Sequence, residues 1–178
     1  MKQNIVNKIN PDEDFQQIIT SNKYNLFDII RGILNQIGQS NMRIATFSNS
    51  EEFLRRLYIQ KQKGLIAHLE LITDNKAAKK TLKLSYFIRK VYDEVFFANN
   101  HSKVVLFDNE QHHLAVLTSQ NQTRGSRFEV HVISNNPLFF HDLECGFEQV
   151  KNKSRNVNGL LDRHIERNRK LCASTNSD

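Results

Sequence analysis

Several residue types that define whole classes of protein are scarce in this sequence. Two prolines and six glycines among 178 residues exclude a collagen-like chain and a long Pro/Gly-rich disordered chain. Cys145 and Cys172 lie far apart without a CxxC pair, so we expect reduced thiols, a cytoplasmic location and no zinc finger. No apolar run approaches the roughly 18 residues that span a bilayer, and the polar first residues lack a signal-peptide core, so neither membrane insertion nor export is expected.

The residues that are present suit one domain with a substantial core. Hydrophobic residues make up 39% of the chain, so folding needs no disulfide or structural metal. Lys plus Arg number 25 against 19 Asp plus Glu, which gives a formal net charge of +6. This charge is compatible with an anionic partner but does not establish one.

The chain divides into a polar N-terminal arm or early strand at 1–24, a main domain at 25–150, and a basic tail at 151–178 with the pattern of a short helix at 158–171. Periodicity predicts helices at 26–37, 50–62, 74–90 and 137–150, and strands at 42–47, 65–73, 94–98, 103–107, 114–118 and 128–133. Strands first alternate with helices and then follow one another. This order predicts an α/β fold, with a mixed β-sheet flanked by helices on both faces.

Capping residues mark where two of these helices begin. Asn25 is placed to cap the helix at 26–37, and Gly38 is placed to end it. Ser48 and Glu51 have the spacing of a capping box, which predicts that they open the next helix.

A set of polar side chains lies on consecutive predicted strands. His101 and Lys103 are two residues apart, so they face the same side of an extended chain. Ser119 and Asn121 repeat this spacing after the next strand, and Glu129 lies in a third. Adjacent antiparallel strands would therefore bring together an imidazole, an ammonium, a hydroxyl, an amide and a carboxylate.

These groups suit an attack on a phosphodiester. Lys103 supplies positive charge, while Ser119 and Asn121 supply neutral donors to the phosphoryl oxygens. The neutral imidazole of His101 is a nucleophile that forms a phosphohistidine, and Glu129 is placed to accept the other imidazole N–H. None of these steps needs a metal or a cofactor.

The same residues bring a resemblance to the phospholipase D superfamily. The run HSKVVLFD, from His101 to Asp108, fits the His-x-Lys-x4-Asp motif of that family. The run TSQN, from Thr118, resembles its Gly-Ser-x-Asn element, and RFE, from Arg127, resembles its Asn-x-Glu element, with Thr for the usual Gly and Arg for the usual Asn. The resemblance implies a phospholipase D-like catalytic domain over 25–150, in which Asp108 orients and holds the site.

The motif occurs once, and in this the chain resembles the small nuclease branch, where two identical chains meet in one site. The resemblance implies that one His101 is the nucleophile and that its counterpart protonates the leaving oxygen and then activates water. The resulting expectation is a metal-independent phosphodiesterase that hydrolyses DNA as a homodimer, without a cofactor and without a membrane.

Basic residues near the motif are candidate contacts to a phosphate backbone. Arg124 and Arg127 are close to it in sequence. A helix is expected to begin at Asp74 or Asn75 and to continue to about Lys90. Four lysines at helical spacing share one face of this helix: Lys76, Lys79, Lys80 and Lys83. An ordinary solvated face explains these lysines equally well, and the basic tail suits either nucleic acid or a partner chain.

Three further histidines need a separate interpretation. His112 and His113 lie in a polar run between two predicted strands, which indicates a solvated hairpin turn rather than a metal pair. His131 shares the strand parity of Glu129, which favours a buried or supporting role near the site.

Two other functions remain open at the level of sequence. A lipid phosphodiesterase or phosphatidyltransferase would use the same chemistry, although the single motif and the lack of an apolar anchor favour a nuclease. A catalytically silent nucleic-acid-binding module is compatible with the replacements at Thr118 and Arg127, whereas the intact His101, Lys103 and Glu129 favour an enzyme.

Overall fold

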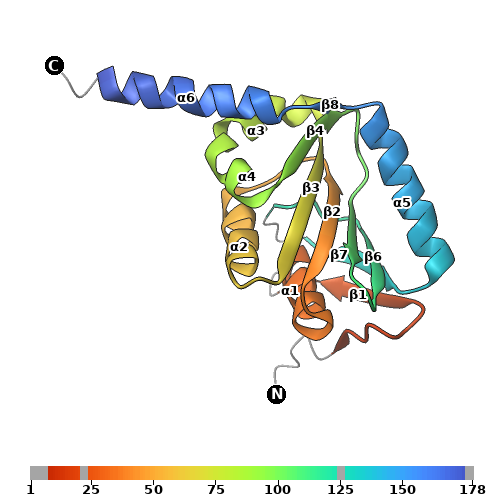
Figure 1. Cartoon of the computed structure of the whole chain (residues 1–178). Helices are drawn as coiled ribbons and strands as arrows, with labels where there is room; N and C mark the ends of the chain where they lie inside the picture. The colour runs from red at the N-terminus through yellow and green to blue at the C-terminus, as the bar shows by residue number, and fades with distance from the viewer. Residues whose placement is uncertain (1–7, 21–23, 124–126, 175–178) are drawn as a thin grey trace.

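The computed structural model describes residues 8–20, 24–123 and 127–174, which form an α/β fold (Figure 1). The strands are β1 (Gln16–Thr20), β2 (Ser40–Thr46), β3 (Ile66–Asp74), β4 (Glu94–Ala98), β5 (Val104–Asp108), β6 (His113–Thr118), β7 (Glu129–Ser134) and β8 (Arg155–Asn156). The helices are α1 (Leu26–Ile37), α2 (Glu51–Gln62), α3 (Ala78–Lys83), α4 (Ser85–Val91), α5 (Pro137–Asn152) and α6 (Asn158–Ser174), with a 3-10 turn, η2, at Asn75–Ala77.

All these strands belong to one mixed sheet in the order β1-β7-β6-β5-β2-β3-β4-β8. The central strands β2, β3 and β4 are parallel, and the sheet continues through antiparallel pairs to β1 on one side and β8 on the other. Because of these directions, the ends of β2, β3, β4 and β6 meet the beginnings of β5 and β7 at one end of the sheet. His101 and Lys103, which precede β5, lie at this shared end together with Ser119 and Glu129.

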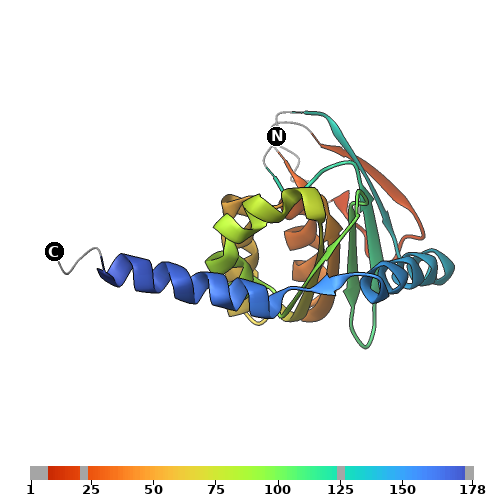
Figure 2. The same ribbon diagram turned by 90° about the horizontal axis from the view of Figure 1, so that it is seen from above.

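Alternation along the strands gives the sheet two buried faces. Val105 and Phe107 of β5 pack in the larger core, which α1, α2 and α4 complete. Leu106, between them, faces the other side and packs in a smaller core with Phe140 and Phe147 of α5. Figure 2 shows α5 separated from α1 and α2 by the sheet. The expected mixed sheet with helices on both faces is thus confirmed.

The first helix begins and ends as its capping residues predict. The side chain of Asn25 accepts from the amide of Phe27 over 2.9 Å, and Asp28 completes a capping box. Gly38 ends the helix with φ of 78°, a backbone conformation that side-chain-bearing residues rarely adopt.

The capping box expected from Ser48 does not form. The helix begins instead at Glu51, and Ser50 is its N-cap, with its hydroxyl accepting from the amide of Phe53 over 3.3 Å. Ser50 is the N-cap instead of Ser48 because it directly precedes the first helical residue and its backbone is extended. In this conformation its side-chain oxygen reaches the backbone amide three residues further along the chain.

The single helix expected from Asp74 to Lys90 is also wrong. Asp74 does cap the first turn, through its contact with the amide of Lys76 at 2.7 Å, but the chain then forms η2, α3 and α4, with a break at Leu84. The break lets α4 pack along both α2 and α6, and Ile88 and Val91 enter the core. Tertiary packing here overrides a pattern that is continuous in sequence.

The C-terminal segment forms a strand and a long helix. The two-residue β8, which was not expected, pairs with Phe96 and Phe97 of β4 and is too short to leave a sequence pattern. The following α6 projects beyond the body of the protein (Figures 1 and 2), and Leu161 is the residue of this helix that is fully buried. None of the described helices is both long and apolar enough to cross a bilayer.

Replacing Asn25 by Ala is expected to lower the free energy of unfolding by about 1 kcal/mol, because the amide of Phe27 loses its side-chain acceptor. Urea denaturation measures the change. The exposed Asn35, on the same helix, is the matched control: Asn35→Ala should leave stability unchanged or slightly raised. Equal effects of the two substitutions would contradict the capping role.

Candidate functional site

The two leading motif residues lie in the segment that enters β5. His101 is exposed, and its ring meets that of Phe47 edge to face, with centroids 5.7 Å apart. Lys103 is half-buried, and its ammonium donates to the carbonyl oxygen of His101 over 3.0 Å. The cation is therefore held beside the backbone of the proposed nucleophile.

Asn100 fixes this segment to the ends of two strands. Its amide N–H donates to Asp74 at the end of β3 over 2.9 Å, and its side-chain nitrogen donates to the carbonyl of Thr46 at the end of β2 over 3.3 Å. The hydroxyl of Ser102 donates to the side-chain oxygen of Asn100 over 2.5 Å. Asn100 is 5% exposed, so its bonds to Asp74 and Thr46 lie away from competing water. Sequence reasoning missed this residue, because a single Asn before the motif carries no periodic signal.

Two backbone hydrogen bonds extend the site across β6 and β7. The amide of Thr118 donates to the carbonyl of Lys103, and the amide of Ser119 donates to that of Val130, each over 3.0 Å. The hydroxyl of Ser119 donates to the carboxylate of Glu129 and accepts from the amide of Val130. In this structure the recorded hydrogen-bond partner of Glu129 is therefore Ser119; the expected bond from Glu129 to an imidazole N–H remains a proposal.

Asn121 joins the site from the other side. Its side-chain oxygen accepts from the amide of Phe47 over 3.2 Å and from the hydroxyl of Thr46 over 3.4 Å. Phe47 thus links the two residues, because its backbone amide donates to Asn121 and its ring contacts that of His101. With the oxygen of Asn121 engaged, the amide nitrogen is the group of this side chain that suits a phosphoryl oxygen.

The structure does not bring Asp108 to this group of residues. It ends β5, pairs with Asn41 near the start of β2, and its carboxylate lies 2.5 Å from Nδ1 of His113. The physical reason is strand length, because β5 carries the chain about 3.3 Å further from the motif with each residue. The expected role of Asp108 in orienting the site has no contact to support it. The expected hairpin between β5 and β6 is confirmed, but His113 begins β6 instead of lying in the turn, and His112 is half-buried.

A buried histidine lies under Ser119 and Glu129. His131 is 0% exposed, and Thr118 contacts its Nδ1 and Thr20 its Nε2, each at 2.8 Å. Burial lowers the pKa of His131 to about 4. The expected buried role is confirmed. The structure also accounts for the threonine at position 118, where the family has glycine. The hydroxyl of Thr118 is turned to the imidazole of His131.

The candidate phosphate-binding residues lie in separate segments of the chain. All four lysines of η2 and α3 are exposed: Lys76, Lys79, Lys80 and Lys83. Their segment follows β3 at the motif end of the sheet, where the side chain of Asn75 donates to that of Asn99 over 3.1 Å. Arg127 is exposed just before β7, and Arg124 lies outside the described residues.

A group of possible metal ligands lies at the opposite end of β3 and β4. Atoms of His68, Glu70 and Glu94 lie within 4.8 Å of one another, but the ammonium of Lys151 is 2.7 Å from Glu70 and 3.5 Å from Glu94. Although burial acts to lower the pKa of Lys151, these carboxylates raise it above its usual value. A cation of the protein itself therefore neutralises this group.

Comparison with known proteins identifies the fold. No family model and no curated protein matches the chain in sequence. Nuc from Salmonella typhimurium, a phospholipase D family member, superposes with a TM-score of 0.61 at 16% identity, covering 80% of this chain and 98% of that one. NucT from Helicobacter pylori gives 0.61 at 15% identity, covering 80% and 99%. Phosphatidylserine synthase from Haemophilus influenzae gives 0.61 at 12% identity, covering 90% and 46%.

These similarities show that the chain has the fold of the phospholipase D family, as its motifs predict. At such identities the likeness concerns the fold alone. The chemistry of this chain has to be argued from its own residues.

The buried His131 should make stability depend on pH. The ordinary pKa of histidine is 6.5, and between this pH and about 4 the unfolded chain binds a proton that the folded imidazole does not. The free energy of unfolding therefore decreases by up to about 3 kcal/mol as the pH is lowered through this range. His131→Gln, which removes the titrating group, should have a flatter profile. Urea denaturation at pH 7.5 and pH 4.5 compares the two proteins, and parallel profiles would exclude this role for His131.

Proposed function

We propose that this protein is a metal-independent phosphodiesterase, a nuclease that hydrolyses DNA through a phosphohistidine intermediate. The observation that carries the proposal is the hydrogen-bonded chain from Lys103 through Thr118 and Ser119 to β7. This chain links Lys103, Ser119 and Glu129, which supports a shared role for them. Similarity to two proteins of the phospholipase D fold over nearly their whole length supports the same chemistry.

The reaction follows from the position of each group. The neutral imidazole of His101 forms a bond to phosphorus while the bond to the leaving oxygen breaks and that oxygen takes a proton. The ammonium of Lys103 and the amide of Asn121 stabilise the charge that builds up on the other phosphoryl oxygens. Water then attacks the phosphohistidine and gives its proton to the group that protonated the leaving oxygen, so that the bond between nitrogen and phosphorus breaks, the imidazole is restored and a phosphate monoester is released.

The proton for the leaving oxygen requires a second acid. The motif occurs once in the chain, so a homodimer in which a second His101 faces the first supplies this acid without another residue type. One imidazole then has to be neutral and the other protonated. A bell-shaped pH profile of activity follows from this requirement.

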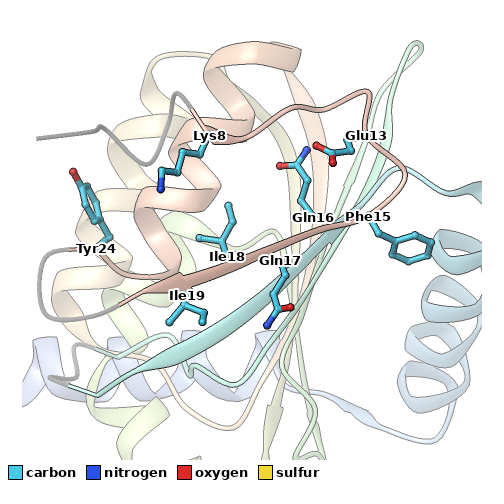
Figure 3. A pocket seen from close by; sticks show the side chains of 8 residues that line it. All are labelled: Lys8, Glu13, Phe15, Gln16, Gln17, Ile18, Ile19 and Tyr24. Atoms are coloured by element: carbon cyan, nitrogen blue, oxygen red, sulfur yellow. The ribbon is translucent and has the colours of Figure 1, made fainter.

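An exposed apolar patch beside the site is the surface proposed for the contact with the second copy. Its members are Leu117, Val130 and Ile19, which are 41%, 43% and 63% exposed. Ile19 pairs with Val130 across β1 and β7, and Val130 holds Ser119 through its backbone. Figure 3 shows that Ile19 extends from β1 on the side opposite to Ile18, which is buried in the core. The patch therefore continues directly into the site that needs a partner.

Phosphatidyl transfer is the second candidate function, because a phosphatidylserine synthase shares the fold over 90% of this chain. The exposed lysines favour a polyanion instead, since each one that contacts a DNA phosphate releases a counterion. Parallel assays on plasmid DNA and on phospholipid vesicles separate the two functions.

His101→Ala should abolish hydrolysis of both DNA and bis(p-nitrophenyl) phosphate in excess EDTA, in which the parent protein should remain active. Lys103→Ala should reduce the rate on the order of 100- to 1000-fold, because it removes a charged donor to the developing oxyanion. The exposed His141 is the control, and His141→Ala should retain the parent rate. Full activity of His101→Ala, or loss of parent activity in EDTA, would refute the mechanism.

Val130→Asp should weaken both dimerisation and activity, because it places a charge in the centre of the apolar patch. Sedimentation velocity and activity across a dilution series measure the two effects together. Ile59 of α2 is similarly exposed on another face, and Ile59→Asp should change neither. A monomer that keeps full activity on dilution would contradict the shared site.

Replacing the four lysines of η2 and α3 by Ala should make DNA binding less dependent on salt. The log–log slope is expected to fall by about 0.9 for each lysine that contacts a duplex phosphate. The control replaces four exposed lysines elsewhere, which removes the same net charge: Lys63, Lys90, Lys153 and Lys170. A slope equal to that of the parent protein would mean that the η2 and α3 lysines are an ordinary solvated surface.

A further inference from the structure

A mostly apolar cavity of about 260 Å³ lies between α5 and the sheet, next to the candidate site. Ala45 of β2 and Val104 of β5 form the sheet side, and Gly146 and Phe147 form the helix side. Val104 pairs with Leu117 in the register of β5 and β6, so the cavity adjoins the apolar patch described above.

One wall of this cavity is formed by the segment around His101. Asn100 and Ser102, which flank His101 in sequence, both line it. Ala45 also lies two residues before Phe47, whose ring contacts the imidazole, and two residues of a strand span about 7 Å. The cavity therefore shares a wall with the segment that carries His101.

Gly146 keeps this space open. It lies inside α5, where glycine is the least favourable residue after proline. A Cβ placed on it would meet no heavy atom within 4 Å, so packing does not require glycine here. A larger side chain at this position would occupy the cavity.

We propose that the cavity receives the nucleobase next to the scissile phosphate, an inference that rests on the proposed nuclease function. A base has apolar faces and a polar edge, and the cavity offers matching surfaces: aliphatic and aromatic walls with Asp142 and Ser102 among the polar groups. One sugar separates a base from its phosphate, so a base in the cavity leaves its phosphate beside the segment that carries His101. The base must be unpaired to enter, so single-stranded DNA is the preferred substrate.

Asp142 gives the cavity a preference among bases. An ionised carboxylate only accepts hydrogen bonds, and Asp142 is the ionisable group among the described residues of the lining. Adenine, cytosine and guanine each present an exocyclic amino group as a donor, whereas thymine presents carbonyl oxygens there. Cleavage next to cytosine should exceed cleavage next to thymine, and Asp142→Asn should reduce this difference.

The test compares single-stranded oligonucleotides that are identical except for one abasic nucleotide placed on either side of a mapped cleavage bond. For the parent protein, loss of the base on one side should lower kcat/KM by roughly 5- to 150-fold, the range expected for one stacked base. Gly146→Leu should bring this ratio close to one by filling the cavity, and Ala45→Val should do so from the sheet side if the first variant folds poorly. Cys145 is exposed on α5 next to Gly146, and Cys145→Leu should keep the parent ratio.

The outcomes separate the two proposals. Hydrolysis of bis(p-nitrophenyl) phosphate without any effect of the abasic nucleotide would overturn the base-binding cavity and leave the phosphodiesterase standing. If no diester is hydrolysed, the proposed function fails, and calorimetric titration still decides the cavity. Deoxycytidine monophosphate should then bind at least about 5-fold tighter than deoxyribose 5-phosphate, with the difference lost in Gly146→Leu. Equal affinities of the two compounds would overturn it.

Discussion

The amide of Thr118 donates to the carbonyl of Lys103, and the amide of Ser119 donates to the carbonyl of Val130. These bonds continue the antiparallel register of β5, β6 and β7 one step beyond their regular ladders. His101, Ser119 and Glu129 all lie in or beside this extension, so a slip of one residue in either strand pair would turn their side chains to the opposite face. The chemistry of the site therefore depends on backbone register before it depends on any side-chain contact.

A buried polar contact, in a position where apolar side chains are usual, helps to fix the register of these strands. His131 bridges Thr118 of β6 and Thr20 of β1 through its two ring nitrogens. A neutral imidazole fits because each hydroxyl can donate or accept, so both ring nitrogens are satisfied whichever of them carries the proton. Three adjacent strands are thus tied together directly beneath Ser119 and Glu129. The threonine in place of the family's glycine takes part in this tie, which makes the replacement structural.

Much of this arrangement could be predicted from sequence because it depends on local periodicity. The helix capped by Asn25, the strands around the motif and the mixed sheet follow from alternation and spacing, and the structure confirms them. The break at Leu84 could not be predicted, since it results from packing of α4 against α2 and α6. Asn100 was missed for a similar reason, because its importance comes from the ends of β2 and β3 meeting beside it. Asp108 lies far from the site because β5 separates it from His101 and Lys103. A sequence motif gives residue types and their order but not this length in space.

The face of the sheet that carries α5 is the face on which the proposed reaction would meet its partners. Next to the segment that carries His101, α5 leaves a cavity that Gly146 lines, and it leaves Leu117 and Val130 of the neighbouring strands exposed. A more complete helical cover would bury this apolar area and add stability, as α1, α2 and α4 do on the other face. Because α5 covers this face incompletely, space remains next to His101. The proposed site requires such space, since it would take both a second imidazole and a substrate from outside the chain. On this argument the least covered part of the fold is the part that the proposed reaction uses.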